Sequence, residues 1–365
     1  MFSPDDYDFE LPTEQIAQAP ASERSAARMF VLAEAGAAVS THSRVGALEA
    51  VLDGVAEARG QRPLIVVNDS RVVPARIHVF RATGGRVELL VVDPAALGPG
   101  ARVRAWARGA RRLREGEVLR LPGAHGETAL LELRYLGAEG EGEAADSRAR
   151  VFEIVRGQLL DALEAVGELP LPPYIARPEG PDAADRERYQ TLYARHRGSV
   201  AAPTAGLHFD AAMLERLEVA PITLHVGPGT FLPMDTEDVR AHRVGSERYS
   251  ISEASAARIE AARAEGRPIL AVGTTATRTL ESVALANGGA IVPGSGRTEL
   301  VITPGYRFSV VDLLLTNFHL PRSSLLMLVC CLGGRERVLA AYAEAVAAGY
   351  RFYSYGDCML VERSG

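Results

Sequence analysis

The hydrophobic and polar positions follow two different periods along the chain, and the changes of period divide it into three blocks. In the first block, up to about residue 70, apolar runs at 28–32 and 64–67 predict strands, and the pattern at 45–58 predicts an amphipathic helix between them. The third block, from about residue 156, alternates helical patterns with short apolar runs, which is typical of a layered α/β sheet. Its expected helices are 156–166, 185–196, 211–217, 253–264, 275–286, 323–332 and 335–348, and its expected strands are 221–226, 268–272, 300–302, 312–316 and 351–355.

The middle block, about 71–155, alternates short strand patterns with turns. Strands are expected at 75–81, 86–92, 102–107, 117–121, 128–135 and 150–154, and a glycine-rich acidic loop at 137–147. Many short strands at this spacing, with Gly84 and Gly85 as a hairpin turn, indicate a small β-barrel or sandwich. Because the first block resembles the third, we expect a discontinuous α/β layered domain, residues 1–70 plus 156–365, with an inserted β-barrel domain at 71–155.

Composition narrows the possible chemistry. The chain has 365 residues and no lysine, so all 40 of its positive side chains are arginines. This excludes lysine Schiff bases, the P-loop lysine and lysyl-adenylate ligases. Arginine replaces a solvated lysine freely, so biased composition explains the pattern, and selection for bidentate phosphate recognition is the alternative.

Cysteine usage and hydropathy indicate a cytoplasmic protein. The three cysteines, Cys330, Cys331 and Cys358, form no C-x-x-C pair, which fits a reducing compartment and predicts neither disulfides nor a cysteine zinc cluster. The amino terminus is acidic, and no apolar stretch reaches the ~20 residues that cross a bilayer. We therefore expect no membrane association.

Charge is unevenly distributed. The net charge is −6, yet residues 71–120 contain eleven arginines and four acidic residues, a local charge of +7. A basic patch on an acidic protein suits a phosphate backbone, and a solvated face of a β-domain is the alternative.

Several polar residues lie where a predicted strand or helix ends at a glycine or proline turn. Thr274, Thr275 and Arg278 open the helix expected at 275–286, where unpaired N–H groups suit a carboxylate or phosphate. A plain helix cap with a solvated arginine is the alternative. His208, His225 and His319 also adjoin such turns, where side chains reach a cleft. No spacing of histidine, cysteine or carboxylate residues predicts a metal site.

Together these segments resemble a known family. In chain order, the segments that carry the resemblance are DYDFELPTEQIAQAP, NDSRVVPAR, GGRVELLVV, LPLPPYI, SVAAPTAGLHF, TLHVGPGTF, AVGTTATRTLES, TNFHLPRSSLLMLV and YRFYSYGD. They are similar to the S-adenosylmethionine:tRNA ribosyltransferase-isomerases of queuosine biosynthesis, over nearly the whole chain.

The resemblance implies an activity. Such enzymes transfer the ribosyl group of S-adenosylmethionine to 7-aminomethyl-7-deazaguanine at the wobble position of tRNA and isomerise it. The product is epoxyqueuosine-tRNA, and adenine and methionine are released. The resemblance also implies an α/β domain with an inserted β-barrel, no metal and no prosthetic group, and we expect a monomer. The arginines expected to contact tRNA are Arg71, Arg76, Arg108, Arg111, Arg112 and Arg114.

The implied reaction requires a base to remove a proton from the carbon next to the sulfonium and an acid to assist adenine departure. The candidates for proton transfer are His208, His319, Glu247 and Asp357. We expect Thr204, His225 and Asn317 to bind polar groups of the substrates. Thr274, Thr275 and Arg278 are expected to hold the methionine carboxylate.

The chain also departs from the family pattern. It has Gly245 before Ser246 and Glu247, where many members have histidine, so no essential histidine is assigned there. In two stretches where family members have lysines, this chain has arginines. Arginine preserves the positive charge, but it cannot act as the base that a lysine amine could be. The alternatives are a methyltransferase that uses S-adenosylmethionine and a non-catalytic RNA-binding protein. The chain lacks the acidic residue before a G-x-G-x-G loop that such a methyltransferase would have, and an RNA-binding module would leave the polar loop ends of the α/β domain unexplained.

Overall fold

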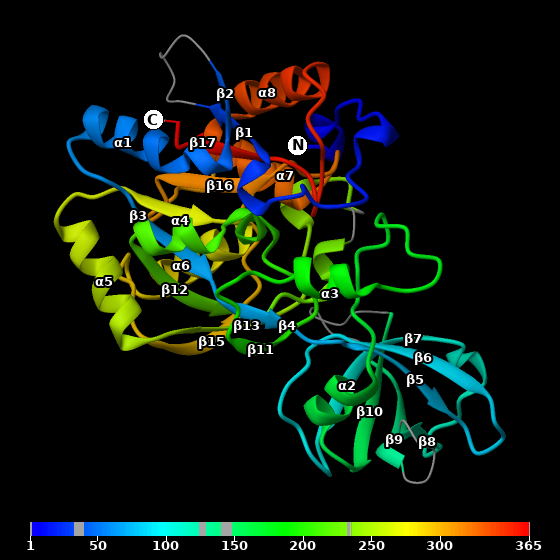
Figure 1. Ribbon diagram of the computed structural model, residues 1–365. Helices are drawn as coiled ribbons and strands as arrows, with labels where there is room; N and C mark the ends of the chain where they lie inside the picture. The colour runs from blue at the N-terminus through cyan, green and yellow to red at the C-terminus, as the bar shows by residue number, and fades with distance from the viewer. Residues whose placement is uncertain are drawn as a thin grey trace.

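The computed structural model describes residues 2–32, 40–123, 129–139, 148–231, 234 and 236–364. In these ranges, nine strands form one large sheet, and six others close into a barrel beside it (Figure 1). Across the large sheet the order is β15 (Gly294–Thr298), β13 (Glu247–Ile251), β12 (Val219–Leu224), β3 (Leu64–Asn68), β14 (Ile269–Val272), β16 (Leu313–Asn317), β17 (Cys358–Glu362), β1 (Arg28–Leu32) and β2 (Thr41–Arg44).

The centre of the large sheet is parallel and buried on both faces. Strands β12, β3, β14 and β16 run in the same direction, so their carboxyl ends meet at one edge of the sheet. One face is covered by α1 (Leu48–Arg59) and α4 (Ala211–Arg216). The other is covered by α5 (Glu253–Ala264), α6 (Thr274–Ala286), α7 (Ser324–Gly333) and α8 (Arg335–Ala347). Helices on both faces explain why the central strands are continuous apolar runs.

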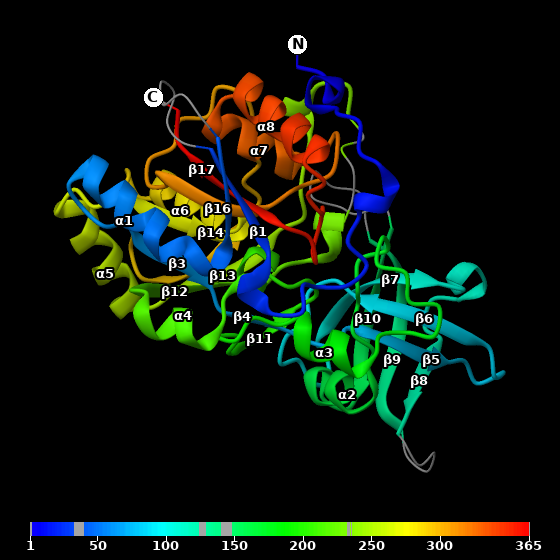
Figure 2. The same cartoon turned by 45° about the horizontal axis from the view of Figure 1, so that its top comes forward.

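The barrel alternates inward apolar and outward polar residues along each strand. Its order is β10 (Ala149–Arg156), β7 (Arg102–Arg108), β6 (Arg86–Val91), β5 (Arg76–Phe80), β8 (Val118–Pro122) and β9 (Ala129–Ala138). The helix α2 (Leu159–Val166) lies against the barrel (Figure 2). It packs into the same core through Leu159 and Leu163. The barrel therefore has a hydrophobic core separate from those of the sheet.

The chain enters and leaves the barrel at neighbouring points. Arg76 and Glu168 form a two-way backbone bridge with N···O distances of 3.2 and 2.8 Å. Next to it, β4 (Ser70–Val72) pairs in parallel with β11 (His196–Ser199). A Cβ on Gly167 would lie 2.0 Å from the carbonyl oxygen of Pro74, so only glycine fits between the two crossings.

An ionic contact also joins the barrel to the far edge of the large sheet. Asp93, which follows β6, accepts from Arg248 Nε at 2.7 Å and from Arg297 at 3.2 Å. The carbonyl of Pro94 accepts from Arg248 Nη2 at 2.7 Å. These contacts fix the barrel beside strands β13 and β15.

The expected fold class is confirmed: an α/β layered part with an inserted small β-barrel. Most expected elements are present within a few residues of their observed limits. The remaining elements are α3 (Ala183–Arg188) and the short 3₁₀ helices η1 (Pro4–Tyr7), η2 (Thr13–Gln15), η3 (Arg24–Ala26), η4 (Val45–Ala47), η5 (Ala110–Arg112), η6 (Thr204–His208), η7 (Pro228–Phe231) and η8 (Val239–Ala241). Most of the expected loop at 137–147 lies outside the described residues.

Three expected elements are wrong. The helix expected at 185–196 ends after Arg188. The last residue of the expected range, His196, instead begins β11, because the carbonyl of Asp69 accepts from the N–H groups of Arg195 and His196. The strand expected at 300–302 is replaced by β15, which comes before it in the chain. The strand expected at 351–355 is a turn held by the Asp357 carboxylate, which accepts the N–H of Arg351 at 2.8 Å. The strand β17 follows that turn.

None of the helices in the described ranges is long and apolar enough to cross a bilayer.

Candidate active site

A pocket opens at the carboxyl ends of the central strands, where an open α/β sheet binds its ligands. It encloses about 800 Å³ of empty space, part of it open to solvent. The lining comes from segments that are distant in the sequence, the main ones being Ala201–Ala205, Gly273–Thr275, Thr316–Leu320, Ser323–Leu325 and Tyr353–Ser354, with Tyr174, Tyr189 and Val226. Of the predicted site residues, the pocket collects Thr204, Thr274, Thr275, Asn317 and His319.

The first turn of α6 forms one side of this pocket. Gly273 has φ 87°, which lets β14 turn directly into the helix. Thr274 and Thr275 then face the pocket from the positive end of the helix dipole, with N–H groups that an α-helix leaves unpaired. Asn68 at the end of β3 fixes this turn by donating to Thr275 Oγ1 at 3.2 Å and to the carbonyl of Leu224 at 2.9 Å.

Asn317 holds another side of the pocket. Its Nδ2 donates to the carbonyl of Tyr353 at 2.9 Å, which sets the orientation of the side-chain amide. Its Oδ1 is buried beside the His208 ring and makes no hydrogen bond of ordinary geometry among the described residues. An incompletely hydrogen-bonded acceptor is destabilising when buried, so a group of a bound ligand could complete its hydrogen bonding.

His319 is held in place on the pocket wall. Its Nε2 lies 2.7 Å from Thr316 Oγ1, and its backbone N–H donates to Tyr342 Oη at 3.0 Å. Burial lowers the pKa of His319 to about 3. The imidazole is therefore neutral at physiological pH.

His208 lies behind the pocket wall. It shares η6 with Thr204, but it lines a smaller pocket together with Arg24 and Ser354. Its Nε2 is buried and makes no hydrogen bond of ordinary geometry among the described residues, and the Asn317 side chain lies next to the ring. Burial lowers the pKa of His208 to about 4, and the nearby Asp357 carboxylate only partly opposes this shift.

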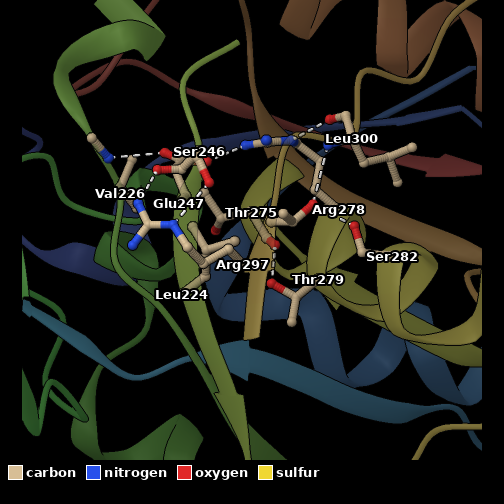
Figure 3. A network of polar contacts seen from close by, with 12 residues as sticks. Leu224, Val226, Ser246, Glu247, Thr275, Arg278, Thr279, Ser282, Arg297 and Leu300 are labelled. Carbon is tan, nitrogen blue, oxygen red and sulfur yellow. Dashed lines mark hydrogen bonds and ion pairs between the residues drawn. The ribbon is translucent and has the colours of Figure 1, made fainter. Parts of the chain in front are cut away.

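Glu247 and Arg278 form a buried ion pair rather than lining the pocket (Figure 3). Arg278 also donates from Nε to the carbonyl of Leu300 at 2.8 Å. The second carboxylate oxygen of Glu247 accepts the N–H of Gly227 at 2.8 Å. The pair therefore fixes the loop beside Val226, and the guanidinium is not directed at the site expected for the methionine carboxylate.

Asp357 and His225 also lie outside the pocket lining. The Asp357 carboxylate accepts the backbone N–H groups of Arg28 at 2.9 Å and Arg351 at 2.8 Å, so it holds the turn that carries Tyr353. His225 lies near the junction with the barrel, where burial and then Arg248 lower its pKa to about 4.

The described lining of the pocket contains no carboxylate and no guanidinium. It is instead rich in hydroxyl groups and aromatic rings. No local sequence pattern singles out Tyr174, Tyr189 or Tyr353, although Tyr174 and Tyr353 fall in the LPLPPYI and YRFYSYGD segments. Their convergence depends on long-range packing, which no local spacing reveals.

The arginines expected to contact tRNA are all on or next to the barrel. Arg71, Arg108, Arg111, Arg112 and Arg114 are exposed. Arg76 is half-buried and lies 3.5 Å from Glu88.

Comparison with known proteins identifies the family. The family model described as queuosine biosynthesis protein matches residues 4–361. The chain belongs to this family. Curated relatives named S-adenosylmethionine:tRNA ribosyltransferase-isomerase include those of Anaeromyxobacter dehalogenans (strain 2CP-C), 50% identical over 98% of this chain and 99% of the relative, and Geotalea uraniireducens, 43% identical over 98% of each. A crystal structure of S-adenosylmethionine tRNA ribosyltransferase from Thermotoga maritima is 28% identical, covers 97% of this chain and 99% of its own, and has a TM-score of 0.49.

Membership of the queuosine biosynthesis family confirms the predicted family and the predicted enzyme class, a transferase of tRNA modification. Neither the methyltransferase nor the non-catalytic RNA-binding alternative is favoured by these matches.

Proposed function

We propose that this protein transfers the ribosyl group of S-adenosylmethionine to 7-aminomethyl-7-deazaguanine at the wobble position of tRNA. The ribose is isomerised, epoxyqueuosine-tRNA forms, and adenine and methionine leave. The observation that carries the proposal is the pocket at the strand ends, which brings together a helix amino terminus, a half-buried neutral histidine and a buried amide oxygen. Relatives that are 50% and 43% identical bear the name of this activity.

S-adenosylmethionine is a co-substrate, and the pocket offers groups for its polar parts. The methionine carboxylate is placed at the first turn of α6, against Thr274 and Thr275, because N–H groups and the dipole favour an anion there. Thr204 and the Oδ1 atom of Asn317 are placed near the ribose hydroxyls. No metal or prosthetic group is part of this scheme.

His319 is the proposed proton-transfer group. The ring is unprotonated, so a nitrogen lone pair can accept the proton from the carbon next to the sulfonium. A pKa near 3 makes the ring a weak base, so the positive sulfur must supply most of the acidity of that carbon. Once protonated, the ring is a strong acid and passes its proton on, which suits protonation of the departing adenine. Thr316 fixes the ring through the 2.7 Å contact with Nε2.

The other candidates receive supporting roles in this proposal. Glu247 and Arg278 position the Gly227 loop, and Asp357 positions the turn of Tyr353. His208 supports Thr204 and Asn317 from behind, while His225 lies at the junction with the barrel.

The barrel is the proposed docking surface for the tRNA. Its exposed arginines at 108–114 supply positive charge to an otherwise acidic protein. We propose that residues 71–155 form this domain together with α2, which packs into its core. Residues 1–70 and the chain after α2 form the proposed catalytic domain, and the protein is proposed to act as a cytoplasmic monomer.

A single assay tests the activity. The protein is incubated with S-adenosylmethionine and tRNA carrying the aminomethyl-deazaguanine, and the mass of the modified nucleoside is measured while adenine and methionine are quantified. Epoxyqueuosine with equal amounts of adenine and methionine is expected. A gain the size of a methyl group would indicate a methyltransferase, and unchanged nucleoside with tight tRNA binding would indicate a binding protein; either result contradicts the proposal.

A further inference from the structure

Two tyrosine rings form one wall of the large pocket. The rings of Tyr174 and Tyr353 stack nearly parallel, with centroids 4.4 Å apart and an interplanar angle of 22°. Both residues line the pocket. They come from segments almost 180 residues apart in the chain, so only the folded protein brings them together.

The wall is held rigid from behind. Tyr353 has φ 71°, a left-handed conformation that is uncommon for a bulky residue. Its carbonyl accepts from Asn317 at 2.9 Å, and its N–H donates to the carbonyl of Phe318 at 3.0 Å. Tyr174 Oη lies 2.6 Å from Ser354 Oγ. An unusual backbone conformation that is fixed on several sides indicates a preorganised surface. Such a surface loses less conformational entropy when a ligand binds.

Tyr174 is the more accessible of the two rings. Tyr353 is only 6% exposed, whereas Tyr174 is half-buried. One face of Tyr174 is covered by Tyr353, so the surface that it presents to the pocket is the opposite face or the ring edge. A third flat ring on the opposite face would extend the existing stack.

Two buried polar groups beside this wall are incompletely hydrogen-bonded. Tyr189 is fully buried and lines the pocket, and its hydroxyl lies near Ser354 and the backbone of Ala202 but makes no hydrogen bond of ordinary geometry among the described residues. Oδ1 of Asn317 stands in the same relation to His208. A nucleobase carries donors and acceptors around its edge and can complete the hydrogen bonding of both groups. A sulfonium could also lie over a tyrosine ring, but it has no hydrogen-bonding edge and would leave both groups as they are.

We propose that Tyr174, backed by Tyr353, is the stacking platform for a purine-type base. The inference rests on the proposed function, which supplies two such bases: the adenine of S-adenosylmethionine and the 7-deazaguanine of the tRNA. Stacking on an aromatic side chain tolerates either ring, because each has a flat π-face.

The test measures equilibrium binding to the full chain by dialysis, with two probes for the base and with S-adenosylmethionine for comparison. S-adenosylhomocysteine carries adenine next to a neutral sulfur, and free 7-aminomethyl-7-deazaguanine carries the other base. Tyr174→Leu is expected to weaken binding of one probe about tenfold or more, and the affected probe identifies the base. Tyr174→Phe keeps the ring, removes only the hydrogen bond with Ser354, and is expected to keep the affinity.

The matched control is Tyr306→Leu. Tyr306 is also half-buried beside another aromatic ring, Phe308, but it does not line the pocket. Its replacement is expected to leave the affinity for both probes unchanged. Far-UV circular dichroism checks that each variant is folded.

Tyr174→Trp gives a second measurement if the leucine variant does not fold. The chain has a single tryptophan, Trp106 in the barrel, so new fluorescence reports position 174. Quenching by one of the probes is expected, because the base would stack on the indole.

Three results would overturn the inference. They are equal affinity of Tyr174→Leu and the wild type for both probes, absence of binding of both probes to the wild type, and a fall in S-adenosylmethionine affinity with unchanged S-adenosylhomocysteine affinity. The last would show that the ring recognises the sulfonium charge. Formation of epoxyqueuosine by the wild type alongside any of these results would leave the proposed function intact.

Discussion

His319 combines a position on the pocket wall with an ionisation state that burial fixes. A histidine with an ordinary pKa near 6.5 would be partly protonated at neutral pH. In His319 burial holds the pKa near 3, so the neutral form is the only populated one. The 2.7 Å contact with Thr316 Oγ1 sets the ring orientation.

Replacement of His319 by glutamine tests the proton-transfer role. Glutamine keeps a polar group of similar reach but cannot transfer a proton, so kcat is expected to fall by about 10²–10⁴-fold with a smaller effect on KM. Steady-state kinetics with both substrates measures the split. His42→Gln is the control, because His42 is exposed and pairs with Glu344 outside the pocket. Unchanged kcat in His319→Gln would remove His319 from the scheme.

His208 makes stability depend on pH. Its pKa in the folded chain is about 4, below the ordinary value, so the unfolded chain binds more protons between pH 4 and about 6.5. The contribution of neutral His208 to the free energy of unfolding is fully present above pH 6.5. It is lost as the pH falls through this window, by about 1.4 kcal/mol per pH unit. Urea unfolding of His208→Gln from pH 7 to 4.5 is expected to show a shallower decline than the wild type. Parallel curves would contradict the shift.

Individual site residues are only partly predictable. Thr204, Thr274, Thr275, Asn317 and His319 reach the pocket because each follows or begins an element at the carboxyl edge of the sheet, which the sequence pattern places there. The surroundings of Glu247 and Asp357 depend on contacts with Arg278 and with backbone N–H groups far along the chain, and no local pattern contains that information. Their roles stay proposals.

At the scale of elements, predictability follows burial. The central strands β3, β14 and β16 are apolar throughout, because both faces are covered, and their patterns predict them correctly. The edge strands β2 and β15 consist largely of polar and glycine residues and carry no such pattern, so the sequence does not predict them. These segments are strands because they pair with a neighbouring strand, and not because of their composition.

The ion pair of Arg278 and Glu247 joins α6 to β13 and is a test of coupling between elements. Both side chains are buried, so removing one leaves an uncompensated charge. We expect Glu247→Leu or Arg278→Met alone to lower the free energy of unfolding by about 3–5 kcal/mol. The decrease in the double variant should be smaller than the sum of the two.

Urea denaturation of the four proteins in this cycle measures the coupling. Arg216→Met is a control, because its pair with Glu49 is exposed and surface pairs contribute less than about 1 kcal/mol. Additive decreases in the double variant would show that the pair does not act as a unit.

At the scale of the whole molecule, charge is segregated between the two parts. The net charge of −6 includes a window of +7 at residues 71–120, which forms most of β4, most of the barrel strands and η5. Long-range attraction of a polyanion is therefore concentrated on the barrel, while the candidate pocket has no charged side chain in its described lining.

The salt dependence of tRNA binding tests this segregation. The double change Arg111→Ala and Arg112→Ala is expected to weaken binding and to reduce the slope of log K against log salt by about 1 for each phosphate that is no longer neutralised. Filter binding between about 50 and 300 mM salt, where screening changes strongly, gives the slope. Arg216→Ala with Arg258→Ala removes the same charge from exposed positions on α4 and α5. Equal slopes for the two double variants would contradict barrel docking.

The bridge between Arg76 and Glu168 bears on how such a protein could have arisen. Because the chain leaves the α/β part and returns to it at hydrogen-bonded neighbours, the whole barrel occupies the place of a hairpin turn. A gene for the α/β part alone could have gained the barrel by one insertion at this point, without moving any strand of the large sheet. Recognition of the tRNA and chemistry on it could then have been acquired in separate steps.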